Sequence, residues 1–204
     1  MKRKILSIVI FFVALESGNA QNADIRLLHY INSSASPAKD NVFKFMSNSN
    51  TAMNLAIPAG LGLAAIIDRD TDMFENACVM VAASALNAGV TLALKYTINR
   101  QRPFKTYPSL VVKKTDAGDP SFPSGHTSSA FATATSLSLA YPKWYVIVPS
   151  YLWAGSVAYS RLYLGAHYPT DVLGGMIIGS GCAYLTFKAN QWLRKKYCKR
   201  HAKE

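Results

Sequence analysis

Residues 77–103 read ACVMVAASALNAGVTLALKYTINRQRP. The first part, residues 77–94, carries no charged side chain, exceeds the length of an ordinary strand and is rich in Ala and Leu, which favour helices. Lys95 and Arg102 follow it, and Pro103 then prevents the helix from continuing. The segment therefore predicts an apolar helix that carries Lys95 and Arg102 at its end.

Four more apolar stretches of similar length flank this segment, and polar or turn-forming residues separate them. Two shorter amphipathic segments, 23–31 and 37–46, precede the set. The pattern predicts an all-α fold, a helical bundle of about five core helices plus short N-terminal helices. The core stretches are 52–67, 77–94, 127–141, 144–159 and 172–187.

The same stretches bear on whether the bundle lies in a membrane. They are at or below the length of about 20 residues that a membrane span needs, and residues 127–141 are rich in hydroxyls. A mean hydropathy of +0.09 also suits a soluble core. However, residues 77–94 and 144–159 are apolar on nearly every face, which is unusual for the outer helices of a small soluble bundle. We expect a membrane-embedded bundle, with a soluble one as the alternative.

The N-terminus has the pattern of a secretory signal. Basic residues at 2–4 precede an apolar run at 5–15, and small residues lead to Ala20. We expect residues 1–20 to be a signal peptide cleaved after Ala20, which leaves residues 21–204 as one domain. The alternative is an uncleaved anchor, although the apolar run is shorter than the roughly 20 residues of a span.

The net charge of +11 is unevenly distributed. The C-terminal tail, residues 188–204, carries +6, whereas residues 21–187 carry only +3. A basic tail that follows an apolar segment fits the cytoplasmic side of a membrane. An ordinary solvent-exposed C-terminus is an equal alternative explanation of the charge. If the chain starts on the periplasmic side and each of the five core helices crosses the membrane once, the loop 95–126 lies on the periplasmic side. We expect no nucleic-acid partner.

Polar residues gather at the ends of the apolar stretches. Lys95 and Arg102 lie seven residues apart, so they share one helix face and can clamp an anion. Ser124 and Gly125 open the next helix, where backbone amides bind anions and a glycine lets a phosphate approach. His126 titrates near neutral pH and can donate a proton to a leaving oxygen.

A third polar cluster begins at Ser160. Arg161 precedes His167, and Asp171 falls in the first turn of the helix that Pro169 starts. A carboxylate there can hold one imidazole nitrogen and leave the other free to attack phosphorus. Taken singly, each residue has an ordinary interpretation as a cap, a first-turn charge or a surface cation. Together they predict a phosphate site at the helix ends.

These three clusters match a linked signature in order. It reads Lys, six residues, Arg-Pro; then Pro-Ser-Gly-His; then Ser-Arg, five residues, His, three residues, Asp. The chain resembles the type 2 phosphatidic-acid phosphatase (PAP2) family. The resemblance implies that His167 forms a phospho-histidine, Asp171 supports it and His126 protonates the leaving group, with no metal or cofactor. The implied phosphate-binding residues are Lys95, Arg102, Ser124, Gly125, His126 and Arg161.

The resemblance also implies a class of substrate. We expect hydrolysis of phosphate monoesters or pyrophosphates of envelope lipids, such as phosphatidic acid, phosphatidylglycerol phosphate, undecaprenyl pyrophosphate or a lipid A phosphate. The enzyme would lie in a bacterial inner membrane with its site facing the periplasm. A soluble bundle would instead suit a nonspecific periplasmic acid phosphatase acting on small phosphate esters.

Two rival functions remain open. Vanadium-dependent haloperoxidases resemble this family and hold vanadate with the same residues, but the short chain with an envelope signal disfavours them. A non-catalytic polybasic protein that binds membranes or nucleic acid would explain the basic tail. It would leave both histidines, His126 and His167, without a role.

Overall fold

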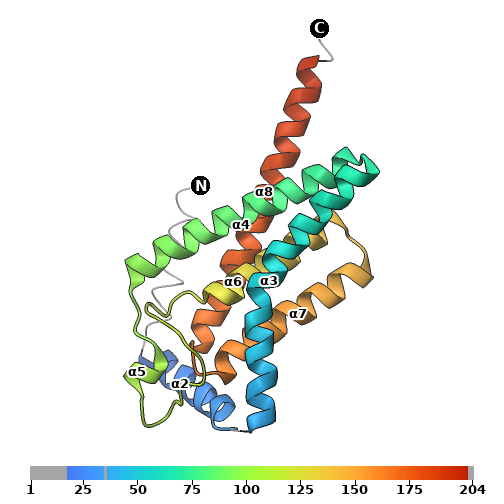
Figure 1. The fold of residues 1–204 in the computed structure, drawn as a ribbon. Helices are drawn as coiled ribbons and strands as arrows, with labels where there is room; N and C mark the ends of the chain where they lie inside the picture. The colour runs from blue at the N-terminus through green and yellow to red at the C-terminus, as the bar shows by residue number, and fades with distance from the viewer. Residues whose placement is uncertain (1–17, 35, 202–204) are drawn as a thin grey trace.

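The computed structural model describes residues 18–34 and 36–201, and the regular structure within them is helical, as predicted (Figure 1). Residues 1–17, which hold most of the predicted signal peptide, lie outside the described residues. The helices are α2 (Gly18–Asn32), α3 (Pro37–Asp68), α4 (Thr71–Ile98), α5 (Pro103–Thr106), α6 (Gly125–Ala140), α7 (Trp144–Tyr163) and α8 (Pro169–His201).

Helix α6 forms the centre of the bundle and packs against α3, α4, α7 and α8. Its closest neighbour is α8, because two glycines let the backbones touch. A Cβ at Gly179 would collide with the carbonyl of Ser128, and one at Gly175 would lie 2.7 Å from the carbonyl oxygen of Ser124. This close crossing holds the start of α8 beside the start of α6.

The hydroxyls of α6 join helices rather than facing water. Thr133 donates to Asn54 of α3 at 2.7 Å, and Ser128 lies 3.0 Å from the hydroxyl of Thr91 in α4. Buried polar groups need such partners, and small hydroxyl residues let apolar helices pack closely. The hydroxyl content of this segment is therefore compatible with an apolar environment.

The expected break between residues 37–46 and 52–67 is wrong, since α3 runs unbroken through both. The polar residues between them look like a loop in the sequence. In the fold their side chains form hydrogen bonds with neighbouring helices. Ser47 accepts a hydrogen bond from Arg161 of α7 at 2.5 Å, and Asn50 donates to a serine of α6 at 2.9 Å.

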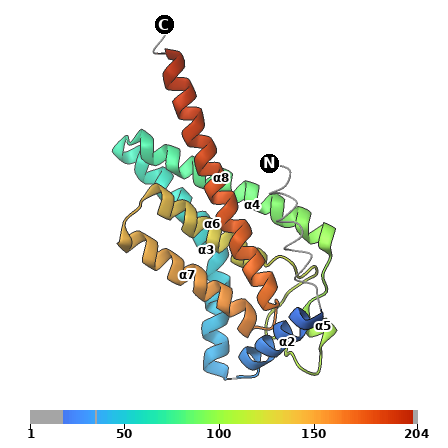
Figure 2. The ribbon, with the colours of Figure 1, turned by 180° about the vertical axis from the view of Figure 1, so that it is seen from behind.

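The last helix is also longer than predicted. Helix α8 continues into the basic tail as far as His201, and Arg194 makes ion pairs with Asp72 at 3.0 Å and Glu75 at 3.4 Å near the start of α4. Figures 1 and 2 show the C-terminal end of α8 projecting away from the end of the molecule where α2 and α5 lie. The basic tail and these two helices therefore mark opposite ends.

Three helical segments in the described part of the chain are long and apolar enough to cross a membrane: Pro37–Asp68, Thr71–Thr106 and Pro169–Lys196. Large apolar side chains such as Leu55, at 69% exposure, face outward from them. The membrane interpretation is therefore favoured over the soluble one.

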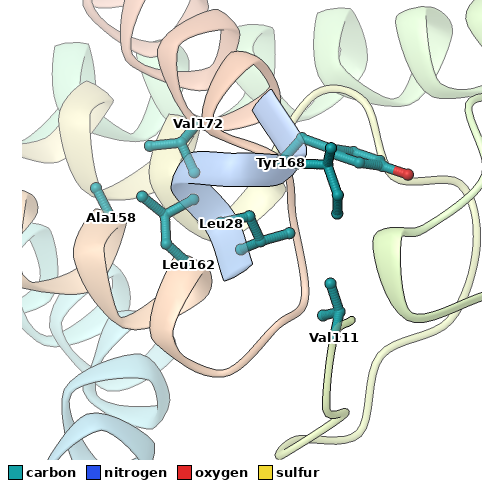
Figure 3. Packing of buried hydrophobic residues seen from close by; sticks show 7 residues of the cluster. Leu28, Val111, Ala158, Leu162, Tyr168 and Val172 are labelled. Carbon is teal, nitrogen blue, oxygen red and sulfur yellow. The ribbon is translucent and has the colours of Figure 1, made fainter. Parts of the chain in front are cut away.

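Helix α2 packs against the end of the bundle where α7 ends and α8 begins. Leu28 is fully buried at the centre of this contact (Figure 3). Burying such a side chain contributes about 1.5–3 kcal/mol, so α2 is firmly docked. The buried cluster comprises Ile25, Leu28, Val111, Ala158, Leu162, Tyr168 and Val172.

Candidate active site

The structure brings the residues of the three sequence clusters to one end of the bundle. Lys95 lies in the last turn of α4, and Arg102 lies just before α5. His126 is in the first turn of α6, Arg161 is in the last turn of α7, and His167 is in the loop before α8. Separate helix ends thus supply the candidate residues, as the sequence predicts. The expected shared helix face of Lys95 and Arg102 is wrong, because α4 ends at Ile98 with Asn99 in the left-handed conformation, and Arg102 lies beyond it.

His167 occupies the buried centre of this cluster, with 2% of its surface exposed. Its Nε2 lies 3.1 Å from Nη1 of Arg102. Because a guanidinium can only donate, Nε2 must be the acceptor, and the proton of the neutral ring is on Nδ1. Burial lowers the pKa of His167 to about 3, and the Arg102 charge adds to this effect while Asp171 opposes it. The ring is therefore neutral at pH 7.

Asp171 is fully buried beside this histidine. Its Oδ2 lies 3.5 Å from Nδ1 of His167, slightly beyond a well-formed hydrogen bond. The same oxygen accepts from the Ser121 hydroxyl at 2.5 Å and from the backbone N–H of Tyr168 at 3.0 Å. Oδ1 accepts from Arg100 at 2.7 Å. The carboxylate is thus held in place from several sides.

Sequence reasoning missed Arg100 and Ser121 as site residues. Arg100 lies between the two signature cations Lys95 and Arg102, and Ser121 shortly precedes the Pro-Ser-Gly-His motif. Their positions inside or beside the motifs were the available signal. Their common partner, Asp171, is 71 and 50 residues away, so only the fold reveals it.

Helix α6 starts where the sequence predicts, with one difference at the cap. Ser124 is the N-cap residue, and its carbonyl accepts from the backbone of Ser128 at 2.9 Å. Its side chain makes no capping bond and instead accepts from the Thr127 hydroxyl at 2.9 Å. Gly125 faces Lys95, whose Cε would lie 4.0 Å from an added Cβ. A cation therefore stands beside the helix start.

The two cations of the first cluster share an acceptor. Lys95 donates to the carbonyl oxygen of Pro120 at 2.7 Å, and Arg102 approaches it at 3.4 Å. Arg102 also donates to the carbonyls of Gly118 at 2.6 Å and Ala166 at 2.7 Å. These partners are neutral oxygens. A phosphate oxygen carries charge and forms stronger hydrogen bonds with the same donors.

Arg161 has a buried N–H group without a hydrogen-bond partner among the described residues. Its side chain is 3% exposed, and Nη1 donates to Ser47 at 2.5 Å. Its Nε has no hydrogen-bond partner among the described residues. A buried donor without a partner is unfavourable, so an anion bound here would be stabilised by it.

His126 is partly buried among these cations. Burial lowers the pKa of its imidazole to about 4, and the charges of Arg161, Arg102 and Lys95 act in the same direction. The ring is therefore neutral at pH 7 before a phosphate binds. The negative charge of a phosphate would offset the cations and raise this pKa.

In the part of the chain that the structure describes, no three His, Cys, Asp or Glu side chains gather closely enough to hold a metal ion. The metal-free reaction that the sequence resemblance implies stays a prediction.

Curated relatives share this region of the chain. A Sulfolobus acidocaldarius undecaprenyl-diphosphatase is 36% identical over 92 residues, which cover 45% of this chain and 44% of that protein. A Bacteroides thetaiotaomicron lipid A 4'-phosphatase is 39% identical over 66 residues, covering 32% and 29%. The undecaprenyl-diphosphatase BcrC of Bacillus subtilis is 32% identical, covering 53% and 59%. The chain thus spans about 30–60% of these relatives' lengths.

Solved structures and a family model agree with this likeness. LpxE of Aquifex aeolicus superposes with a TM-score of 0.64 at 27% identity, covering 81% of this chain and 95% of that one. A transmembrane PAP2-type phosphatidylglycerolphosphate phosphatase of Bacillus subtilis has a TM-score of 0.78 at 23% identity, covering 92% and 94%, and so shares the fold. The model of the PAP2 superfamily matches residues 76–195, more than half of the chain. The chain therefore belongs to the PAP2 superfamily.

Proposed function

We propose that this protein is a membrane phosphatase that hydrolyses phosphate monoesters or pyrophosphates of envelope lipids through a phospho-histidine on His167. The observation that carries the proposal is the state of that ring. Its Nε2 lies 3.1 Å from Arg102, which can only donate, while Nδ1 makes no full hydrogen bond and lies 3.5 Å from the carboxylate of Asp171. This is the arrangement of an activated and oriented nucleophile.

In the first step, Nε2 of His167 attacks phosphorus and the bond from phosphorus to the leaving oxygen breaks. The electron pair stays with that oxygen, which takes a proton from His126. The imidazole of His167 becomes positively charged, and Asp171 stabilises that charge through Nδ1–H. Lys95 and Arg102 neutralise the phosphoryl oxygens, and so does Arg161.

In the second step, water attacks the phosphorus of the phospho-histidine. His126, now unprotonated, accepts a proton from the water, and the bond between phosphorus and nitrogen breaks. Inorganic phosphate leaves, and His167 returns to its neutral form. The same residue therefore serves as acid and then as base.

The pKa of His126 fits this double use. At about 4, because the ring is buried and the three cations beside it are unopposed, the pKa is too low for His126 to carry a proton at pH 7. Binding of a phosphate dianion would raise it, because like-charge repulsion from the cations is then balanced. His126 would thus gain its proton as the substrate binds.

A lipid substrate is supported by two findings. Three helical segments are long and apolar enough to cross a membrane, and relatives bear the names undecaprenyl-diphosphatase and lipid A phosphatase. The basic tail lies at the end opposite to α2 and α5 (Figure 1), which fits a cytoplasmic tail and a periplasmic site. Phosphatidic acid, phosphatidylglycerol phosphate, undecaprenyl pyrophosphate and lipid A phosphates are the candidate substrates.

Phosphate release by the purified full chain, with these lipids and with soluble phosphate esters as substrates, tests the proposal. The His167→Ala variant is the control, because it removes the proposed nucleophile. We expect strong preference for one lipid and no turnover by the variant. Equal turnover of soluble esters would favour the nonspecific acid phosphatase, and an active variant would contradict the nucleophile.

A further inference from the structure

A buried carboxylate outside the signature motifs reaches the candidate site. Asp24 lies in α2, is 5% exposed, and precedes the residues 76–195 that the family model matches. It accepts hydrogen bonds from the backbone N–H of Thr170 at 3.0 Å and from the Thr170 hydroxyl. Asp24 also accepts from Nη2 of Arg100 at 3.0 Å.

Arg100 connects this carboxylate to the one beside the nucleophile. While Nη2 donates to Asp24, Nη1 donates to Oδ1 of Asp171 at 2.7 Å. The guanidinium also stacks 3.9 Å above the ring of Tyr168, which fixes its plane. One guanidinium therefore bridges two buried carboxylates.

The bridge decides which oxygen of Asp171 remains for the imidazole. A guanidinium prefers to pair with both oxygens of one carboxylate. Asp24 retains one amino group of Arg100, so only Oδ1 of Asp171 is paired with it. Oδ2 then stays directed at Nδ1 of His167, with Ser121 as its other side-chain partner.

We propose that Asp24 is a positioning residue of the reaction, which acts through Arg100 to keep Oδ2 of Asp171 oriented toward His167. This rests on the roles proposed above for His167 and Asp171. In this proposal α2, which lies outside the three signature motifs, helps to hold the nucleophile in place.

The test compares Asp24→Asn with the wild-type full chain in detergent, using the best lipid phosphate. The amide keeps the shape but loses the charge, so Arg100 can turn both amino groups to Asp171. We expect kcat to fall at least about tenfold, with KM changed by less than about twofold, because misorientation affects the chemical step more than binding.

A matched variant in the same helix separates positioning from packing. Leu28→Ala removes a fully buried side chain of α2 and leaves Asp24 and Arg100 untouched. We expect it to lower the melting temperature at least as much as Asp24→Asn does, while kcat stays within about twofold of wild type. An equal loss of kcat in Leu28→Ala would show that Asp24 serves only to dock the helix.

A double-mutant cycle tests the route through Arg100. Arg100→Gln should lower kcat on its own, and adding Asp24→Asn should then change it by less than about twofold, since the two residues act as one unit. Fully additive losses would overturn the route. If Asp24→Asn does not fold, Asp24→Glu replaces it, because a longer carboxylate displaces Arg100; wild-type kcat in that variant would overturn the proposal.

The proposed function can fail separately from this inference. A wild-type chain without turnover on any phosphate substrate would overturn both. An active wild type whose kcat is unaffected by Asp24→Asn would overturn the positioning role alone.

Discussion

Arg102 and His167 form a direct pair, with Nη1 of the guanidinium 3.1 Å from Nε2 of the imidazole. Because a guanidinium only donates, the contact requires Nε2, the proposed attacking nitrogen, to be unprotonated and places it beside a proposed phosphate-binding cation. Arg102→Lys keeps the charge but loses the planar fork that also reaches Gly118 and Ala166. We expect kcat/KM to fall about 10- to 100-fold, measured by phosphate release. Full activity would mean that charge alone suffices.

The proposed phospho-histidine can be tested by trapping it directly. Rapid mixing with a substrate labelled in its phosphate, followed by denaturation in base, should leave label on the protein, because a bond from phosphorus to a histidine nitrogen is labile in acid. His167→Ala should carry no label and lose at least about 10³-fold in kcat. Label that persists in this variant would place the intermediate on another residue.

The depressed pKa of His126 predicts how stability depends on pH. The folded-state value of about 4 lies below the roughly 6.5 of an unfolded chain. Between these values the unfolded chain binds more protons, so this contribution is fully present above about pH 6.5 and is lost as pH falls toward 4, by about 1–3 kcal/mol.

His126→Gln should therefore weaken the pH dependence of the melting temperature. Thermal unfolding in detergent between pH 7.5 and 4.5 measures it. The wild type should lose stability more steeply than the variant over this range. Parallel curves would show that the pKa of His126 is not lowered in the folded protein.

Metal removal and a transition-state mimic address the chemistry of the cations. We expect a strong chelator to leave the rate of phosphate release unchanged, since Lys95, Arg102 and Arg161 supply the positive charge. Orthovanadate should inhibit competitively, because it resembles the five-coordinate phosphoryl state. A rate that drops with chelator and returns with added metal would contradict the metal-free mechanism.

The crossing of α6 and α8 gives a stability prediction with an internal control. Gly179→Ala forces a Cβ into the carbonyl of Ser128, whereas Gly181→Ala meets nothing within 4 Å two residues later. We expect the first to destabilise the bundle by about 1–3 kcal/mol and the second to be neutral or slightly stabilising. The melting temperatures of the two variants provide the comparison.

The sequence predicted which polar residues gather better than it predicted helix boundaries. Lys95, His126 and His167 could be expected together because each lies at or next to a helix end, where the motifs place charged and polar groups; their roles stay predictions. The continuity of α3 could not, because the partners of Ser47 and Asn50 lie on other helices and a polar run without them resembles a loop.

Long-range partners were the second gap. Asp24 and Arg100 are 76 residues apart and share no motif, so only the fold places them together. Proximity of this kind depends on how α2 docks, and a single sequence does not reveal it.

The carbonyl oxygen of Pro120 has a consequence for the end of the catalytic cycle. It partners Lys95 and Arg102 when no phosphate does. A cationic site that had to be rehydrated before releasing its product would hold inorganic phosphate tightly and turn over slowly. In the proposed reaction the departing anion would exchange places with an oxygen of the chain itself, so that product release and resetting of the site would become a single event.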